Sequence, residues 1–160
     1  MKQFEIIEKK IIPKDRLSNL ISLWRFKDEI IVFTNGCFDI LHHGHIHLLS
    51  TASDFGHKLI IGMNSDSSAN RLKGEGRPIN GEKERSMMLA SMNMVDAVII
   101  FEEDTPLELI KSIQPDVLVK GGDYKAEDVV GARELKSGRV EIVDFLEGYS
   151  STGVAEKIKS

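Results

Sequence analysis

The chain has 160 residues, 41% of them hydrophobic, which is enough to bury one ordinary core, so we expect a single domain over residues 1–160. Its formal net charge of −4 gives no overall basic field for nucleic acid, which is therefore not an expected partner. The apolar runs are far shorter than the ~20 residues that cross a bilayer, and the first residues lack a secretory-signal layout. We therefore expect no membrane association and a cytoplasmic protein. The single cysteine, Cys37, permits no internal disulfide and agrees with a reducing compartment.

Five apolar, β-branched runs predict strands along the chain. They cover residues 30–34, 59–63, 97–101, 117–119 and 140–145. Stretches with helical features separate them, and each run is apolar almost throughout. This alternation predicts a parallel sheet buried on both faces with right-handed crossovers, which is a three-layer α/β fold.

Local signals mark the helices between these strands. Gly56 is predicted to end the first of them in the left-handed conformation of a C-terminal cap. Residues 70–78 are polar, glycine-rich and basic, which predicts a mobile loop. The helical spacing of residues 87, 88, 89 and 92 predicts a further helix, and its methionines are interpreted as core filler.

The best-marked helix start lies after the third predicted strand. Thr105 offers a capping hydroxyl, Pro106 suits the first helical position, and Glu108 is a carboxylate three residues after the cap. We expect this helix to run to about Gln114.

The densest chemical signal is at residues 34–45, directly after the first predicted strand. The carboxyl ends of parallel strands border the ligand crevice of an open sheet, and a helix N-terminus there offers free N–H groups to an anion. His42 and His45 are three residues apart, so a helix that begins near them projects both imidazoles from one face. Gly44 has no side chain, so a ligand or a neighbouring backbone can approach closely. The pattern predicts a phosphoryl-binding site.

Other interpretations of these residues stay open. His43 and His47 are four apart with Cys37 nearby, which is compatible with zinc, although no second cysteine or acidic pair completes a tetrahedral site. A nucleophilic Cys37 lacks any sign of an activating base. A single histidine near a helix start is often structural.

Residues 34–39 followed by His42-His43-Gly44-His45 resemble the H-x-G-H signature of the cytidylyltransferase-like nucleotidyltransferase superfamily. Further segments resemble, in order, the adenylyltransferases of ADP-heptose synthesis. They are NSD at 64–66, RLKG at 71–74, RPI at 77–79, EDTP at 103–106, PDVLVKGGDY at 115–124, VGA at 130–132 and GYSST at 148–152. The resemblance spans about residues 33–158. In many bacteria this domain is fused to a sugar kinase, for which 160 residues leave no room, so we expect it to stand alone.

The resemblance implies a Rossmann-like five-stranded parallel sheet in the order 3-2-1-4-5. The first and fourth strands then lie side by side, which brings His42 and His45 close to the loop that begins at Lys120. That loop has its own physical interpretation, because a lysine and two glycines past a strand bring both charge and bare backbone to a ligand. A turn with a solvated lysine is the alternative.

By resemblance, the site divides into three groups of residues. The catalytic residues are His42, His45 and Lys73, with Lys73 closing over the triphosphate. The nucleotide-binding residues are Thr34, Asn35, Gly36, Phe38, Gly44, Lys120, Gly121, Ser150, Ser151 and Thr152. The sugar-phosphate-binding residues are Asp39, Arg77 and Asp123. Asp39 and Lys120 are the candidates for contact with the heptose itself, because their motifs border the crevice. A solvated loop is the alternative for Lys73 and Arg77.

The Ser150-Ser151-Thr152 cluster precedes a predicted terminal helix at residues 154–159 and can serve as its N-cap, a role compatible with binding the β- and γ-phosphates. Related enzymes often carry a basic residue just after this cluster, whereas this chain has Gly153. Whether Lys157 replaces it stays open.

The implied reaction is in-line attack by a sugar phosphate on the α-phosphorus of ATP, with Mg²⁺ neutralising the phosphates. The implied acceptor is D-glycero-β-D-manno-heptose 1-phosphate, and the product is ADP-heptose, a lipopolysaccharide precursor. The family's enzymes are commonly oligomeric, which makes a homo-oligomer an expected partner state. The alternatives are a cytidylyltransferase for another sugar or polyol phosphate, a domain that binds ATP without turnover, and a zinc hydrolase.

Overall fold

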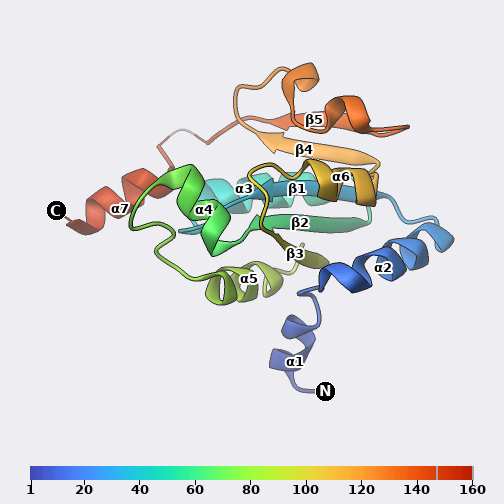
Figure 1. Ribbon diagram of the computed structural model, residues 1–160, viewed down its shortest axis with the longest axis horizontal. Helices are drawn as coiled ribbons and strands as arrows, with labels where there is room; N and C mark the ends of the chain where they lie inside the picture. The colour runs from blue at the N-terminus through green and yellow to red at the C-terminus, as the bar shows by residue number, and fades with distance from the viewer. Residues whose placement is uncertain (147, 160) are drawn as a thin grey trace.

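Five parallel strands form one sheet in the order β3-β2-β1-β4-β5 in the computed structural model, which describes residues 1–146 and 148–159 (Figure 1). The strands are β1 (Ile31–Gly36), β2 (Lys58–Asn64), β3 (Ala97–Phe101), β4 (Val117–Gly121) and β5 (Arg139–Val143). All four neighbouring pairs are parallel. The predicted strand order, the parallel sheet and the α/β fold class are confirmed.

Alternation along β1 divides the core into two apolar layers. Ile31 and Phe33 pack on one face of the sheet, against residues of α2 (Lys14–Phe26) and α6 (Leu107–Ile113). Val32 packs on the other face, against residues of α3 (His43–Ser53) and α5 (Glu82–Ala90). Successive side chains of a strand point to opposite faces, so a strand that is apolar throughout requires both layers.

The remaining helices lie around this core. They are α1 (Gln3–Glu8), α4 (Asp66–Lys73), the 3₁₀ turns η1 (Ala126–Asp128) and η2 (Ala132–Glu134), and α7 (Ser151–Lys159). The link from β4 to β5 contains only the two 3₁₀ turns, whereas helices connect the other strands. None of the helices in the described part of the chain combines the length and apolarity needed to cross a membrane.

The register of the strands brings several chemically active loops to one edge of the sheet. Val32 of β1 pairs with Val117 of β4, and Gly36 of β1 pairs with Met63 of β2. The segments that follow β1, β2 and β4 therefore leave the sheet side by side. As Figure 1 shows, α4 and the start of α7 lie toward this same end of the molecule.

Gly56 does not cap α3 as predicted. The helix ends at Ser53 with Asp54 in the capping position, and Gly56 is not among the glycines with positive φ. A Cβ at Gly56 would lie 2.6 Å from Cγ2 of Val32 and 2.8 Å from the carbonyl oxygen of Ile30. The glycine is therefore required by close packing against the start of β1, and the prediction of a left-handed cap is wrong.

Two segment boundaries also differ from the predictions. The first four residues of the predicted loop at 70–78 belong to α4, which ends at Lys73 and has Gly74, with a φ of 94°, as its C-cap. The predicted fifth strand ends at Val143, two residues before Phe145, whose side chain is 69% exposed. In both cases local composition did not locate the point at which regular hydrogen bonding stops.

The third predicted helix start is one residue off. Pro106 takes the N-cap position, α6 begins at Leu107, and the cap makes no side-chain hydrogen bond, so Thr105 does not cap the helix. The predicted end is close, because α6 stops at Ile113 and Gln114 is left-handed. The methionine helix exists as α5, and the interpretation of core filler holds for Met92 beyond its end, which packs against the second apolar layer.

Candidate functional site

His42 and His45 lie together at the start of α3, as their spacing predicted. His42 occupies the N-cap position in an extended conformation, and the helix begins at His43. The backbone N–H of His42 donates to Nδ1 of His45 over 3.3 Å. The two ring centroids are 3.9 Å apart, with 36° between the ring planes. The two imidazoles can therefore address one group.

The pKa values of both imidazoles are lowered, which favours their neutral forms. Burial, helped by the charges of His42 and Lys73, lowers the pKa of His45 from 6.5 to about 4. Burial and Lys73 also lower the pKa of His42. Because Nδ1 of His45 accepts a hydrogen bond, the proton of its neutral ring is on Nε2, which makes that nitrogen a donor.

Gly44 makes room for the ring of His42. A Cβ at this position would lie 3.0 Å from Cε1 and 3.1 Å from Nδ1 of His42, and 3.4 Å from Cβ of Tyr149. The Tyr149 ring stacks on His42 at 6.5 Å and meets His43 edge-on at 5.1 Å. The sequence suggested that the space at Gly44 would admit a ligand or a neighbouring backbone. The side chains of His42 and Tyr149 occupy this space instead.

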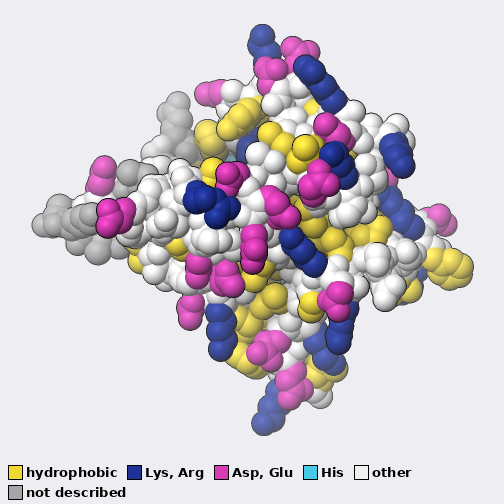
Figure 2. Space-filling model, viewed as in Figure 1, with side chains coloured by type: hydrophobic (Ala, Val, Ile, Leu, Met, Phe, Trp, Pro, Cys, Tyr) yellow, Lys and Arg dark blue, Asp and Glu magenta, His cyan; other side chains and the backbone are white. Residues whose placement is uncertain are grey.

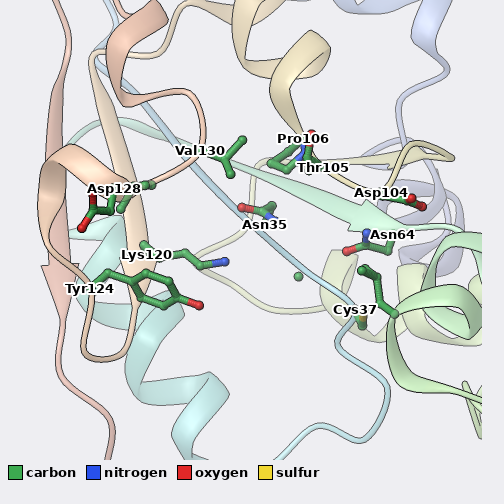
Figure 3. A pocket seen from close by; sticks show the side chains of 13 residues that line it. Asn35, Cys37, Asn64, Asp104, Thr105, Pro106, Lys120, Tyr124, Asp128 and Val130 are labelled. Atoms are coloured by element: carbon green, nitrogen blue, oxygen red, sulfur yellow. The ribbon is translucent and has the colours of Figure 1, made fainter.

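Three adjoining cavities surround the pair. The histidine cavity, about 480 Å³, is lined by His42, Gly44, His45, Leu48, Lys73, Gly121, Val143, Asp144, Phe145, Leu146, Gly148, Tyr149 and Ser150. The strand-end cavity, about 270 Å³, is lined by Asn35, Gly36, Cys37, Asn64, Leu72, Asp104, Thr105, Pro106, Lys120, Tyr124, Asp128, Val129 and Val130 (Figure 3). The connecting cavity, about 260 Å³, shares residues with both. Two compartments therefore meet beside His45.

Lysines mark the junction of these compartments. Lys73, at the end of α4, is exposed and lines the histidine and connecting cavities. Lys120, near the end of β4, is half-buried and lines the strand-end and connecting cavities. Burial lowers the pKa of Lys120, with Cys37 opposing, and its Nζ lies 5.5 Å from the centroid of the Tyr124 ring.

Asp39 and Arg77, both predicted to bind the sugar phosphate, bind each other. Asp39 is fully buried and accepts hydrogen bonds from Nη1 of Arg77 at 2.7 Å, from the backbone N–H of Ile79 at 2.7 Å and from that of Asn80 at 3.2 Å. Neither residue lines one of the three cavities. The pair fastens residues 77–80 to the segment after β1. Its assignment to the sugar phosphate stays a prediction. Asp123 is exposed and also lies outside these linings.

Arg85 is the structurally important residue that the sequence analysis missed. Its side chain is fully buried and donates to the carbonyl oxygens of Asn80, Cys37 and Asn64 and to Oδ1 of Asp66, at 2.6–3.0 Å. It thereby ties together the segments after β1 and β2. One signal was present: Arg85 precedes Leu89 by four residues and so shares the buried face of α5.

The other predicted nucleotide-binding residues differ in whether they line a cavity. Thr34 is 1% exposed, its hydroxyl has no hydrogen-bond partner among the described residues, and it lines none of the three cavities. Phe38 is buried, with its ring centroid 5.3 Å from that of His45. Ser150 lines the histidine cavity, and its Oγ accepts from the N–H of Gly153 at 3.0 Å. The side chains of Ser151 and Thr152 lie outside the described residues.

The competing interpretations of Cys37 and His43 find little support. Burial raises the pKa of the Cys37 thiol, which disfavours the nucleophilic thiolate. The His43 ring packs edge-on against Tyr149. Over the described part of the chain, no three His, Cys, Asp or Glu side chains form a group that could hold a metal ion.

Comparison with known proteins identifies the family. Residues 33–157 match the cytidylyltransferase-like family. The chain belongs to this family. A solved lipopolysaccharide core biosynthesis protein from Thermoplasma volcanium is 30% identical with a TM-score of 0.61, and the match covers 76% of this chain and 99% of that one. A pantoate-beta-alanine ligase from Francisella tularensis, 15% identical with a TM-score of 0.53, shares the fold; the match covers 93% of this chain and 77% of that one.

Among curated proteins, the chain is similar to proteins named bifunctional protein HldE. The relative from Koribacter versatilis is 53% identical over 154 residues, which cover 95% of this chain and 32% of that protein. The relative from Campylobacter jejuni strain RM1221 is 54% identical over 152 residues, with the same coverage. The chain thus spans about a third of the length of these relatives.

Proposed function

We propose that the chain transfers AMP from ATP to D-glycero-β-D-manno-heptose 1-phosphate, giving ADP-heptose and pyrophosphate for lipopolysaccharide core synthesis. The observation that carries this proposal is the pair of imidazoles, His42 and His45, beside the junction of two cavities. Support also comes from the relatives named bifunctional protein HldE and from the lipopolysaccharide core biosynthesis protein of known structure.

In the proposed reaction, an oxygen of the sugar phosphate forms a bond to the α-phosphorus of ATP. The bond from that phosphorus to the oxygen bridging to the β-phosphate breaks, and pyrophosphate leaves with the electron pair. The attacking phosphate is already an anion near neutral pH, so no protein nucleophile or strong base is needed. The protein's task is to align two anions and to stabilise charge that grows on the α-phosphate and the leaving group.

The residues of the histidine cavity suit this task. The neutral His45 ring can donate Nε2–H to a phosphate oxygen without adding a full charge, His42 lies beside it, and Lys73 supplies the cation. Tyr149 and Phe145 line the same cavity and offer apolar surface to a nucleotide base. Ser150, next to the start of α7, extends the cavity toward a helix N-terminus that suits the β- and γ-phosphates.

Mg²⁺ is the proposed cofactor and neutralises phosphate charge when it is bound. Among the described residues that line the histidine cavity, Asp144 is the only carboxylate. A site of this kind fits Mg²⁺, because this ion keeps several waters and binds mainly through substrate phosphates rather than in a protein cage.

A pyrophosphate-release assay tests the proposal, with ATP and CTP each offered with heptose 1-phosphate and with other sugar or polyol phosphates. We expect release with ATP and heptose 1-phosphate and much slower release in every other combination. Preference for CTP would favour the alternative of a cytidylyltransferase for another acceptor. A melting shift with ATP but no pyrophosphate with any acceptor would indicate a nucleotide-binding domain without turnover.

A further inference from the structure

The loop between α4 and α5, residues 74–81, is held at two points. At its start, α4 ends at Lys73, and Gly74 caps the helix with a φ of 94°. Farther along, Nη1 of Arg77 donates to the buried carboxylate of Asp39 at 2.7 Å. The first part of the loop therefore crosses from the end of α4 to the segment that follows β1.

One side-chain amide closes this part of the loop. Asn70 lies in the last turn of α4, and its Nδ2 donates to the carbonyl oxygen of Gly74 at 3.2 Å and to that of Arg77 at 2.9 Å. An amide NH₂ group has two hydrogens, so it can hold both carbonyl oxygens at once. The carbonyl oxygen of Asn70 also accepts from the N–H of Gly74 at 2.8 Å. We call this set of hydrogen bonds the Asn70 clamp.

The residues inside the clamp have little other support. Gly74 and Gly76 have φ values of 94° and 75°, and a Cβ built at either would have no described atom beyond the chain neighbours within 4 Å. Glycine loses more conformational freedom than any other residue when it is ordered, and helix ends fray. The clamp therefore opposes motion at the point where Lys73 ends the helix.

Lys73 differs from its neighbour Arg71 in how its side chain is held. Figure 2 shows Lys and Arg side chains over α4, with Asp and Glu side chains beside them. Nε of Arg71 donates to Oδ1 of Asp104 at 2.7 Å. The described residues give the Lys73 ammonium no such partner, so the backbone beneath it sets where it lies. Burial is the first cause of the lowered pKa values of His42 and His45, and the charge of Lys73 is a further one, so the ammonium lies within reach of both rings.

We propose that Asn70 is a positioning residue, which clamps the loop after α4 and thereby holds the Lys73 ammonium beside His42 and His45 for contact with the phosphates of ATP. This inference rests on the proposed function, in which Lys73 supplies the cation of the histidine cavity. Asn70 lines none of the three cavities, so it acts through Lys73 and does not touch the substrates. Its two side-chain hydrogen bonds are exposed, so they contribute little to the stability of the fold.

Asn70→Leu removes the two side-chain donors with little change in size. Leucine favours a helix more than asparagine does, so α4 should stay intact and the melting temperature should change little. The kcat for AMP transfer should fall by about 10-fold, because a small displacement of a group that acts on the substrate is enough for such a loss. Asn70→Gln keeps the amide donors and should recover part of the loss. Asn19→Leu, the same change at an exposed position of α2, should leave kcat as in wild type. A wild-type kcat in Asn70→Leu would overturn the inference.

A double-mutant cycle shows whether Asn70 acts through Lys73. Lys73→Met removes the ammonium, so adding Asn70→Leu to it should change kcat by less than about 2-fold, although the same substitution costs about 10-fold in the wild-type background. A loss of about 10-fold in both backgrounds would contradict the positioning role, because the effect would then be independent of Lys73.

NMR titration of the histidine rings separates this inference from the proposed function, since it needs neither substrate nor turnover. Lys73→Met removes a charge that lowers the pKa of His42, so this pKa should rise. In Asn70→Leu the ammonium lies farther from the ring on average, and the pKa should rise by a smaller amount. This rise, together with no pyrophosphate release by the wild-type chain, would sink the proposed function and leave the positioning role standing. Normal turnover by the wild-type chain with an unchanged His42 pKa in Asn70→Leu would do the reverse.

Discussion

Asp39 and His45 lie six residues apart on the segment that follows β1, yet the fold gives them opposite surroundings. Asp39 is fully buried and accepts three hydrogen bonds. His45 faces two cavities, and its ring interacts mainly with His42 and Phe38. Asp39 therefore belongs to a buried framework, whereas His45 lines cavities that are open to a ligand.

The framework is a connected set of charged and polar groups. Asp39 binds Arg77 and the backbone of Asn80, Asn80 accepts from Arg85, and Arg85 binds Asp66. Burial of charged groups is costly unless each is paired and hydrogen-bonded, and this condition is met here. The difference teaches that a charged residue in a chemical motif can hold its segment in place, while neighbouring side chains of the same motif stay open to cavities.

The largest expected effect is on turnover, and it comes from the cavity-lining pair His42 and His45. Replacing His42 or His45 by Ala removes a donor to the α-phosphate, so kcat should fall by about 10²- to 10³-fold while the melting temperature changes little. Pyrophosphate-release assays measure the fall in kcat, and thermal melts measure the change in melting temperature. His47→Ala is the control on the same helix and should keep its activity. If His47→Ala abolished turnover and His42→Ala did not, the zinc interpretation would replace ours.

The next effect is on stability, and it comes from Arg85 in the buried framework. Arg85→Met leaves three carbonyl oxygens without their donor, so the free energy of unfolding should fall by about 3 kcal/mol or more. Arg71→Met removes an ion pair whose side chains are 49% and 61% exposed and should cost less than about 1 kcal/mol. Urea denaturation compares the two variants. Equal losses would show that burial does not distinguish these arginines.

A smaller effect tests whether the position of the His42 ring matters for turnover. Gly44→Ala places a methyl group 3.0 Å from the His42 ring, so the ring must shift and kcat should fall by about 10-fold or more. Ser50→Ala, on the exposed face of the same helix, is the control. Full activity of Gly44→Ala would mean that the His42 ring position is unimportant for turnover.

The effect that is smallest at neutral pH is the pH dependence of stability that comes from His45. Its pKa is lowered from 6.5 to about 4 in the folded chain, so the unfolded chain takes up this proton first as the pH falls. Its contribution to stability is present above pH 6.5 and is lost between about pH 6.5 and 4. His45→Gln should therefore show a flatter fall of the free energy of unfolding over this range. A variant that loses stability as steeply as wild type would contradict the lowered pKa.

Sequence reasoning predicted the fold correctly, and it placed His42 and His45 together at the start of a helix. The apolar runs determined the strands because each is buried on both faces, and the spacing of His42 and His45 determined their shared direction. It did not distinguish residues of the buried framework from residues that line the cavities. Asp39 and Arg77 pair with each other across 38 residues of sequence, and local patterns do not reveal such a contact. Arg85 was missed for the same reason, since its partners lie on three other segments.

The most direct test of the central claim is a crystal structure of the chain with a non-hydrolysable ATP analogue and Mg²⁺. We predict that the base lies in the histidine cavity and that the α-phosphate accepts hydrogen bonds of about 2.7–3.2 Å from Nε2 of His42 and His45. The strand-end cavity should remain open beside Lys120. An analogue bound in the strand-end cavity, or an α-phosphate held away from both imidazoles, would contradict the account.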